Sequence, residues 1–129
     1  MKQGRVYFPQ GILPPGQLTS HRIIVLSGNL VIARLRPGSF LACAIIRSAL
    51  NQAGRSVAMV PGHSIPVDAD DFTSMQINGQ VIQHDSIIET HQLFHISIAD
   101  FSTPRVRALG DLNSAKLSDV LAGARKLFT

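Results

Sequence analysis

Two side chains with useful chemistry stand together at the start of an apolar segment. His21 and Arg22 immediately precede the unbroken apolar run 23–26. A neutral imidazole can accept a proton near neutral pH, and a guanidinium binds phosphate or carboxylate through paired hydrogen bonds. The pair therefore has two interpretations: a hydrated strand end, or a strand that presents its first side chains at the rim of a binding site.

Several other kinds of chemistry find little support in the sequence. The five histidines show no metal-ligand spacing with Cys43 or with an acid pair, so we expect no metal site. His91 and His95 are four residues apart, but their segment is at least as typical of a strand and turn as of a helix. The sequence contains no glycine-rich phosphate loop and no G-x-S-x-G nucleophile motif. The acidic stretch 67–72 is better explained as an exposed turn than as a catalytic carboxylate pair.

The chemistry that remains needs a cation, a hydroxyl and a basic groove, and this combination is sufficient to cut RNA. RNA carries its own nucleophile, the 2′-hydroxyl. An enzyme then has to align that hydroxyl, stabilise the charged phosphorus with arginine and move protons. Neither a metal ion nor another cofactor is required, and we expect none.

Length and composition indicate one ordinary domain. At 129 residues and 45% hydrophobic, the chain is large enough for a single core, and we expect one domain over residues 1–129. The lone Cys43 lies in an apolar run, which predicts a buried thiol in a reducing cytoplasm. No stretch approaches the roughly 20 apolar residues that span a bilayer. The start of the chain also lacks a signal-peptide pattern, so we expect a soluble cytoplasmic protein with no membrane association.

Charge is unevenly distributed along the chain. Residues 1–67 contain seven basic side chains and no Asp or Glu, whereas residues 68–100 contain six acids and no Lys or Arg. Such segregation predicts that the two segments face one another in the fold, or that one surface is left basic for an anionic partner.

Short apolar runs separated by turn formers predict strands rather than long helices. We expect strands near residues 5–9, 21–27, 30–35, 41–48, 56–60, 73–77, 80–85 and 87–90. Segment 9–18 has three prolines and two glycines and is predicted to be a long loop. Turns are expected at 36–39 and 51–54, an irregular segment at 60–71, and a two-residue hairpin turn at Asn78-Gly79.

After Ser102 the period of the apolar residues changes to that of a helix. Apolar side chains fall on one stripe at positions 117, 120, 121, 124, 127 and 128. Asn113 is placed to cap the first turn, and Arg125 and Lys126 favour the negative end of the helix dipole. Together these elements predict a mainly β fold, a small curved β domain closed by a C-terminal helix and most simply a barrel.

The order of these features resembles the MazF/PemK (Kid-like) family of toxin endoribonucleases. The matching segments, which cover nearly the whole chain, are GRVYFP (4–9), HRIIVLS (21–27), ACAIIRSA (42–49), VIQHDSIIETHQL (81–93) and LNSAKLSDVLAGARKLF (112–128). The sequence departs from the family pattern where Ile23 replaces Pro and Ser48 replaces Thr. The resemblance implies a small SH3-like β-barrel of the MazF/PemK/CcdB type with a C-terminal α-helix.

The resemblance also implies an activity and a set of site residues. Arg22 matches the family's catalytic arginine and Ser48 its threonine. The expected activity is metal-independent, sequence-specific cleavage of single-stranded mRNA by 2′-hydroxyl attack. His21, Arg47, His63 and Gln83 are predicted to contact the substrate; from chemistry alone, His21 and His63 are candidates for proton transfer.

Partners follow from the same resemblance. We expect a homodimer, single-stranded RNA as substrate, and a cognate antitoxin whose acidic C-terminal segment fills the basic groove. An alternative is a non-catalytic barrel of the same architecture, acting either as a CcdB-like toxin on a protein target or as a nucleic-acid-binding adaptor.

Overall fold

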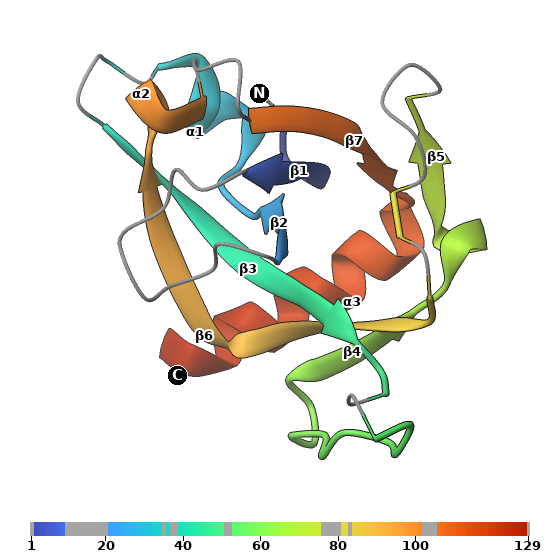
Figure 1. Cartoon of the computed structure of the whole chain (residues 1–129). Coiled ribbons are helices and arrows are strands. Elements are labelled where there is room, and N and C mark those ends of the chain that lie inside the picture. Colours follow the sequence, from blue (N-terminus) through green and yellow to red (C-terminus); the bar gives the residue numbers. More distant parts are fainter. Residues whose placement is uncertain are drawn as a thin grey trace.

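The computed structural model describes residues 2–9, 21–34, 36, 39–50, 53–75, 81–82, 84–101 and 106–128. Figure 1 shows the elements along the chain. The strands are β1 (Arg5–Pro9), β2 (Arg22–Val25), β3 (Phe40–Ser48), β4 (Ser64–Val67), β5 (Phe72–Ser74), β6 (Ser86–Ser97) and β7 (Val106–Leu112). The helices are α1 (Asn29–Ala33), α2 (Ile98–Phe101) and α3 (Ser114–Arg125), with 3₁₀ turns η1 (Ala69–Asp71) and η3 (Lys126–Phe128).

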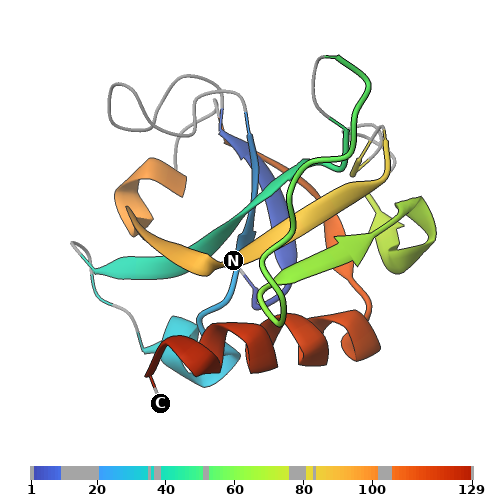
Figure 2. The ribbon, with the colours of Figure 1, turned by 90° about the horizontal axis from the view of Figure 1, so that it is seen from below.

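Within the described residues, seven strands form one antiparallel sheet in the order β4-β6-β3-β2-β1-β7-β5. The sheet curls into a half-barrel, and α3 lies along one side of it (Figures 1 and 2). Irregularities in pairing at Val6/Tyr7 and at Cys43/Ile45 mark bulges, which increase bending and twist. The mainly β fold with a C-terminal helix is as the sequence predicts.

Alternation along the strands produces two cores. On β2, Ile24 faces the inner side of the curl and packs in the same cluster as Val120 and Ala124 of α3. Ile23 and Val25 face outward, in a second cluster with Cys43 of β3 that Ile32 of α1 and Phe101 of α2 help to cover. Burial raises the pKa of the Cys43 thiol to about 12, so this cysteine behaves as a small apolar side chain, as predicted.

The predicted C-terminal helix and its cap are confirmed. The Asn113 side chain accepts a hydrogen bond from the Lys116 amide at 2.8 Å, satisfying one free donor of the first turn. Gly123 allows α3 to approach the sheet closely, since a β-carbon there would lie 2.5 Å from the Thr90 hydroxyl oxygen. The helix therefore covers the inner face of the sheet at one end (Figure 2).

Three predictions for the first 71 residues are wrong. The strand predicted at 30–35 is helix α1, in which Ile32 packs on the outer cluster while Leu30 is 80% exposed. An unbroken apolar run has no period, so it did not distinguish helix from strand. Residues 56–60 form only an isolated bridge, between Ser56 and Leu50. The segment predicted as irregular, 60–71, contains β4 and η1, and Pro66 is tolerated in β4 because that strand lies at the sheet edge.

Several predictions for strands after residue 72 also differ from the structure. The strand predicted at 87–90 is the much longer β6, β7 was not predicted at all, and the described part of 80–85 is not a strand. The strand predicted at 73–77 corresponds to β5, and residues 76–77 lie outside the described residues. So do the Asn78-Gly79 turn, residues 10–18 of the predicted loop, and parts of the turns at 36–39 and 51–54. No helix in the described part of the chain has the length and apolar character needed to cross a membrane.

Candidate functional site

The inner face of the sheet changes character away from α3. On β2, β3 and β6 the buried inner-face residues Ile24, Ile46 and Ile88 each have a polar residue two positions away on the same strand: Arg22 before Ile24, Ser48 after Ile46, and Ser86 before Ile88. The register places Ser48 opposite Ser86 and Arg22 opposite Ile46. The strands that supply the core thus also carry three polar side chains toward the open end of the curl, which α3 does not cover. Figure 2 shows α3 along the other end of the ribbon.

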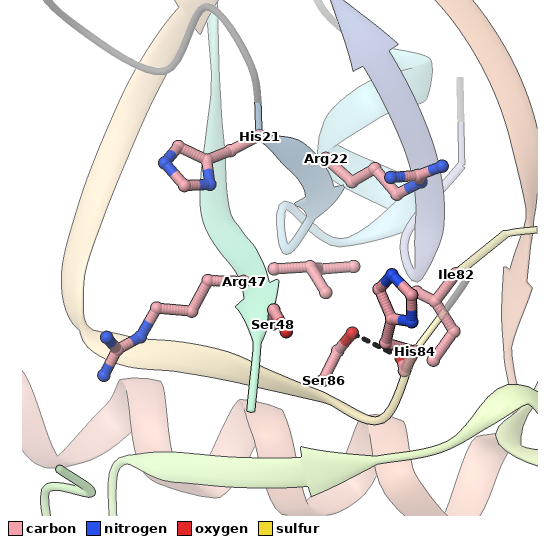
Figure 3. A pocket seen from close by; sticks show the side chains of 8 residues that line it. His21, Arg22, Arg47, Ser48, Ile82, His84 and Ser86 are labelled. Atoms are coloured by element: carbon pink, nitrogen blue, oxygen red, sulfur yellow. Dashed lines mark hydrogen bonds between the residues drawn. The ribbon is translucent and has the colours of Figure 1, made fainter. Parts of the chain in front are cut away.

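These side chains line a pocket of about 240 Å³. Its walls are formed by His21, Arg22, Ile46, Arg47, Ser48, Ile82, His84 and Ser86 (Figure 3). Four residues predicted from the sequence, namely His21, Arg22, Arg47 and Ser48, therefore surround one cavity. The segments that bring them together are the start of β2 and the end of β3, which are direct neighbours in the sheet.

Arg22 holds a charge without a counter-ion among the described residues. Its Nε is buried and unpartnered, and its guanidinium forms no ion pair with a described carboxylate. It lies 5.4 Å from the ring centroid of Phe8, and Arg107 lies 5.8 Å from the same centroid. Burial lowers the pKa of Arg22 below its usual value, and the nearby Arg107 charge lowers it further. Such a site favours the arrival of an anion.

Arg47 differs from Arg22 because its charge is already neutralised. Its Nε donates to Glu89 Oε1 at 2.9 Å, and a terminal nitrogen donates to the Ala58 carbonyl at 2.9 Å. Figure 3 shows the Arg47 side chain directed away from the pocket, so its charge does not face the cavity.

Two imidazoles and two hydroxyls complete the pocket. Figure 3 shows His21 and His84 on opposite sides of it, with His84 toward Arg22. Ser48 is exposed, and its Oγ accepts from the Leu50 amide at 3.3 Å. Ser86 is buried, and its Oγ donates to the His84 carbonyl at 2.8 Å, which ties the segment carrying His84 to β6. The arrangement can bind an anion through Arg22 and exchange protons from two directions.

His63, which was also predicted to contact the substrate, is not among the described residues that line this pocket. His63 precedes β4, and its carbonyl accepts from the amide and hydroxyl of Thr90 at 2.9 and 2.8 Å. Thr90 is four residues beyond Ser86 on β6, which is about 13 Å along a strand. Gln83 lies outside the described residues.

Sequence reasoning missed His84, Ser86, Phe8 and Arg107. The signal for Ser86 was available, because counting back two residues from the apolar Ile88 gives a same-face serine. Phe8 and Arg107 meet through the pairing of β1 with β7, whose sequence separation hides the contact. Among the described residues, no group of three or more His, Cys, Asp or Glu side chains is arranged to hold a metal ion.

The curled antiparallel sheet, the C-terminal helix and the order of the elements define a MazF-like fold. Among solved structures, the Mycobacterium tuberculosis toxin MazF-mt6 is similar, with a TM-score of 0.61 and 14% sequence identity over 96% of this chain and 95% of that one. At this identity the likeness concerns the fold. No known family profile matches the sequence, and no curated protein matches it.

Proposed function

We propose that this chain is a metal-independent endoribonuclease that cleaves single-stranded RNA, acting as the toxin of a toxin–antitoxin pair. One observation carries the proposal: Arg22, unpaired with any described carboxylate, lies at the rim of a pocket that also holds a hydroxyl and two imidazoles. The MazF-like fold supports the same class of activity.

The proposed reaction uses the 2′-hydroxyl of the substrate as nucleophile. The 2′-oxygen attacks the adjacent phosphorus, the P–O5′ bond breaks, and the products are a 2′,3′-cyclic phosphate and a 5′-hydroxyl. Arg22 stabilises the extra negative charge on the phosphoryl oxygens. Of His21 and His84, one accepts the 2′-hydroxyl proton and the other donates a proton to the leaving 5′-oxygen. Ser48 donates a hydrogen bond to the phosphate, while Arg47 stays paired with Glu89 beside the pocket.

Partners follow from the class of protein proposed. The chain would act in the cytoplasm as one domain and as a homodimer, and an antitoxin with an acidic segment would occupy the basic rim. The open end of the curl suits such a segment, because an extended acidic peptide and an RNA strand both present a row of negative charges.

The test is incubation of the purified protein with a long single-stranded RNA in excess EDTA, with analysis of the product ends. We expect cutting at a short recurring sequence, with 2′,3′-cyclic phosphate ends. Arg22→Ala should reduce cutting by about 100- to 1,000-fold, whereas Arg34→Ala, which removes the same charge from the end of α1, should not. Intact RNA, or equal cutting by Arg22→Ala, would overturn the proposal. Intact RNA would favour the non-catalytic alternative.

A further inference from the structure

A second arginine lies close to Arg22, and the proposed reaction does not use it. β1 lies between β2 and β7 in the sheet. On one side Phe8 pairs with Arg107, and on the other side the register Val6↔Ile24 and Tyr7↔Ile23 continues to place Phe8 beside Arg22. One aromatic ring thus has a guanidinium from each neighbouring strand within 5.4 and 5.8 Å of its centroid.

Both cations are left without a counter-ion in the described part of the chain. By contrast, Lys2 and Arg5 pair with Asp111, and Arg47 pairs with Glu89. Neither the Arg22 nor the Arg107 guanidinium makes a hydrogen bond or ion pair with another described residue. Two like charges beside one ring repel each other. Burial is the larger cause of the lowered pKa of Arg22, and the nearby charge of Arg107 lowers it further. A bound anion relieves that repulsion.

The positions of Arg22 and Arg107 fit a strand that carries several phosphates better than they fit a single anion. Arg22 faces the pocket that contains Ser48, whereas Arg107 is exposed on β7, beyond Phe8 and outside that pocket. Phe8 is partly buried against the inner core, so its ring is a fixed spacer between the two guanidiniums. A polyanion that crosses the rim from β3 toward β7 meets Arg22 first and Arg107 next.

We propose that Arg107 is a second phosphate-binding residue, so that Arg22 and Arg107, held apart by Phe8, grip two consecutive phosphodiesters of a single nucleic-acid strand. The inference rests on the proposed function and extends it, because it assigns the phosphate next to the scissile one. Arg107 binds substrate and takes no part in bond breaking.

The first test measures binding without cleavage. A fluorescent 2′-O-methyl oligoribonucleotide, which lacks the nucleophile, is titrated with wild type, Arg107→Gln, Arg107→Lys and Arg34→Gln over a range of salt concentrations. Loss of one phosphate contact on a single strand lowers the slope of log K against log salt by about 0.7. We expect this decrease for Arg107→Gln alone. An unchanged slope, or an equal decrease in Arg34→Gln, would overturn the inference.

The second test asks whether the contact is to the neighbouring phosphate. Wild type should cleave a trinucleotide with two phosphates faster than a dinucleotide with one, when both carry the same scissile step. Arg107→Gln should remove that advantage, whereas Arg34→Gln should keep it. An advantage that persists in Arg107→Gln would contradict the assignment.

The two proposals fail in different ways. If the protein binds the oligonucleotide with an Arg107-dependent slope but leaves RNA intact, the nuclease proposal fails and the phosphate contact stands. If Arg22-dependent cutting occurs while Arg107→Gln changes neither slope nor length preference, the further inference alone is wrong. Arg107 is exposed, so a thermal melt close to wild type is expected for its variants.

Discussion

Arg22 and Arg47 are the same residue type on neighbouring strands, yet they serve different purposes. The register aligns Arg22 with Ile46, the residue just before Arg47. Alternation therefore sends the two side chains to opposite faces of the sheet. On the outer face Arg47 meets the nearly buried Glu89; on the inner face Arg22 meets Phe8 and a second arginine. A shift of one position along a strand separates a cation that pairs with a carboxylate from one that pairs with no described carboxylate.

The carboxylate of Glu89 lies among polar and cationic partners on the outer face. Glu89 is 5% exposed and accepts from Arg47 Nε at 2.9 Å and from Ser64 Oγ at 3.1 Å. His91 Nδ1 lies 2.9 Å from its second oxygen. These contacts offset the cost of burying the charge, and they also neutralise Arg47. The comparison predicts that replacing Arg22 lowers activity and that replacing Arg47 lowers stability.

The largest effect is expected from Arg22→Ala on cleavage. Removing the group that stabilises the transition-state charge should lower kcat by about 100- to 1,000-fold. The free energy of unfolding should stay at the wild-type value or rise, because the variant no longer buries an unpartnered guanidinium beside Arg107. Single-turnover kinetics and urea unfolding measure the two quantities.

Arg22→Lys is the matched control for charge. Lysine keeps the positive charge but loses the planar donor pair, so partial activity is expected. A marked loss of stability in Arg22→Ala would contradict the view that this arginine is reserved for a ligand.

The opposite outcome is expected from Arg47→Ala. The Glu89 carboxylate would remain buried without its main counter-ion, at a cost of about 3 kcal/mol, or roughly 10 °C in Tm. Calorimetry checks the stability, and cleavage measured well below the new Tm should remain close to wild type. If Arg47→Ala folds as stably as wild type but fails to cleave, then Arg47, not Arg22, holds the phosphate.

Ser48→Ala should have a smaller effect, confined to activity. A neutral hydroxyl donating one hydrogen bond contributes about 1 kcal/mol, so the rate should fall by roughly 5- to 10-fold. Ser48 is exposed, so its thermal midpoint should not change. Ser48→Thr, which keeps a hydroxyl at the same position, should retain the wild-type rate. A failure of threonine to do so would indicate that the hydroxyl does not contact the substrate.

Asp111 provides the mildest case, a partly exposed ion pair. Its carboxylate accepts from Arg5 Nε at 3.0 Å and lies 3.4 Å from Lys2 Nζ. Burial favours the protonated form, but the hydrogen bond and charge of Arg5, with help from Lys2, lower the pKa of Asp111 below its ordinary value. The pair therefore stabilises the fold above the unfolded-state pKa, and this contribution is lost as pH falls through the folded-state pKa.

Asp111→Asn should cost about 1 kcal/mol at neutral pH and nothing at a pH below both pKa values. Urea unfolding at several pH values tests this sign. A deficit that grows as pH falls would contradict the assignment of Asp111 as the charged acceptor.

Local patterns revealed the parts of the fold whose contacts are close in sequence or strongly periodic. Short apolar runs predicted β1, β2 and β3. Apolar residues at helical spacing, with Asn113 as the cap, predicted α3. Arg22 and Ser48 could be placed at strand ends on that basis. β7 escaped notice because VRALGDL mixes charge, glycine and apolar residues without clean alternation.

Contacts between distant segments account for the rest. Nothing near Arg47 in the sequence indicates that Glu89, 42 residues away, will neutralise it. The meeting of Phe8 with Arg107 likewise depends on the pairing of the first and last strands of the chain. Residue type and strand ends thus suggested which side chains matter, but the sheet register decided which of them are available.

Because α3 covers one end of the inner face and leaves the other uncovered, side chains at the two ends are under different packing constraints. A substitution beneath the helix must fit a space as tight as the one around Gly123, where even a methyl group collides with Thr90. At the open end, Ser48 and His84 face solvent. A library randomised at the open end should yield mostly folded proteins that differ in their preference for the proposed RNA substrate. A new substrate specificity can therefore arise here while the fold is kept.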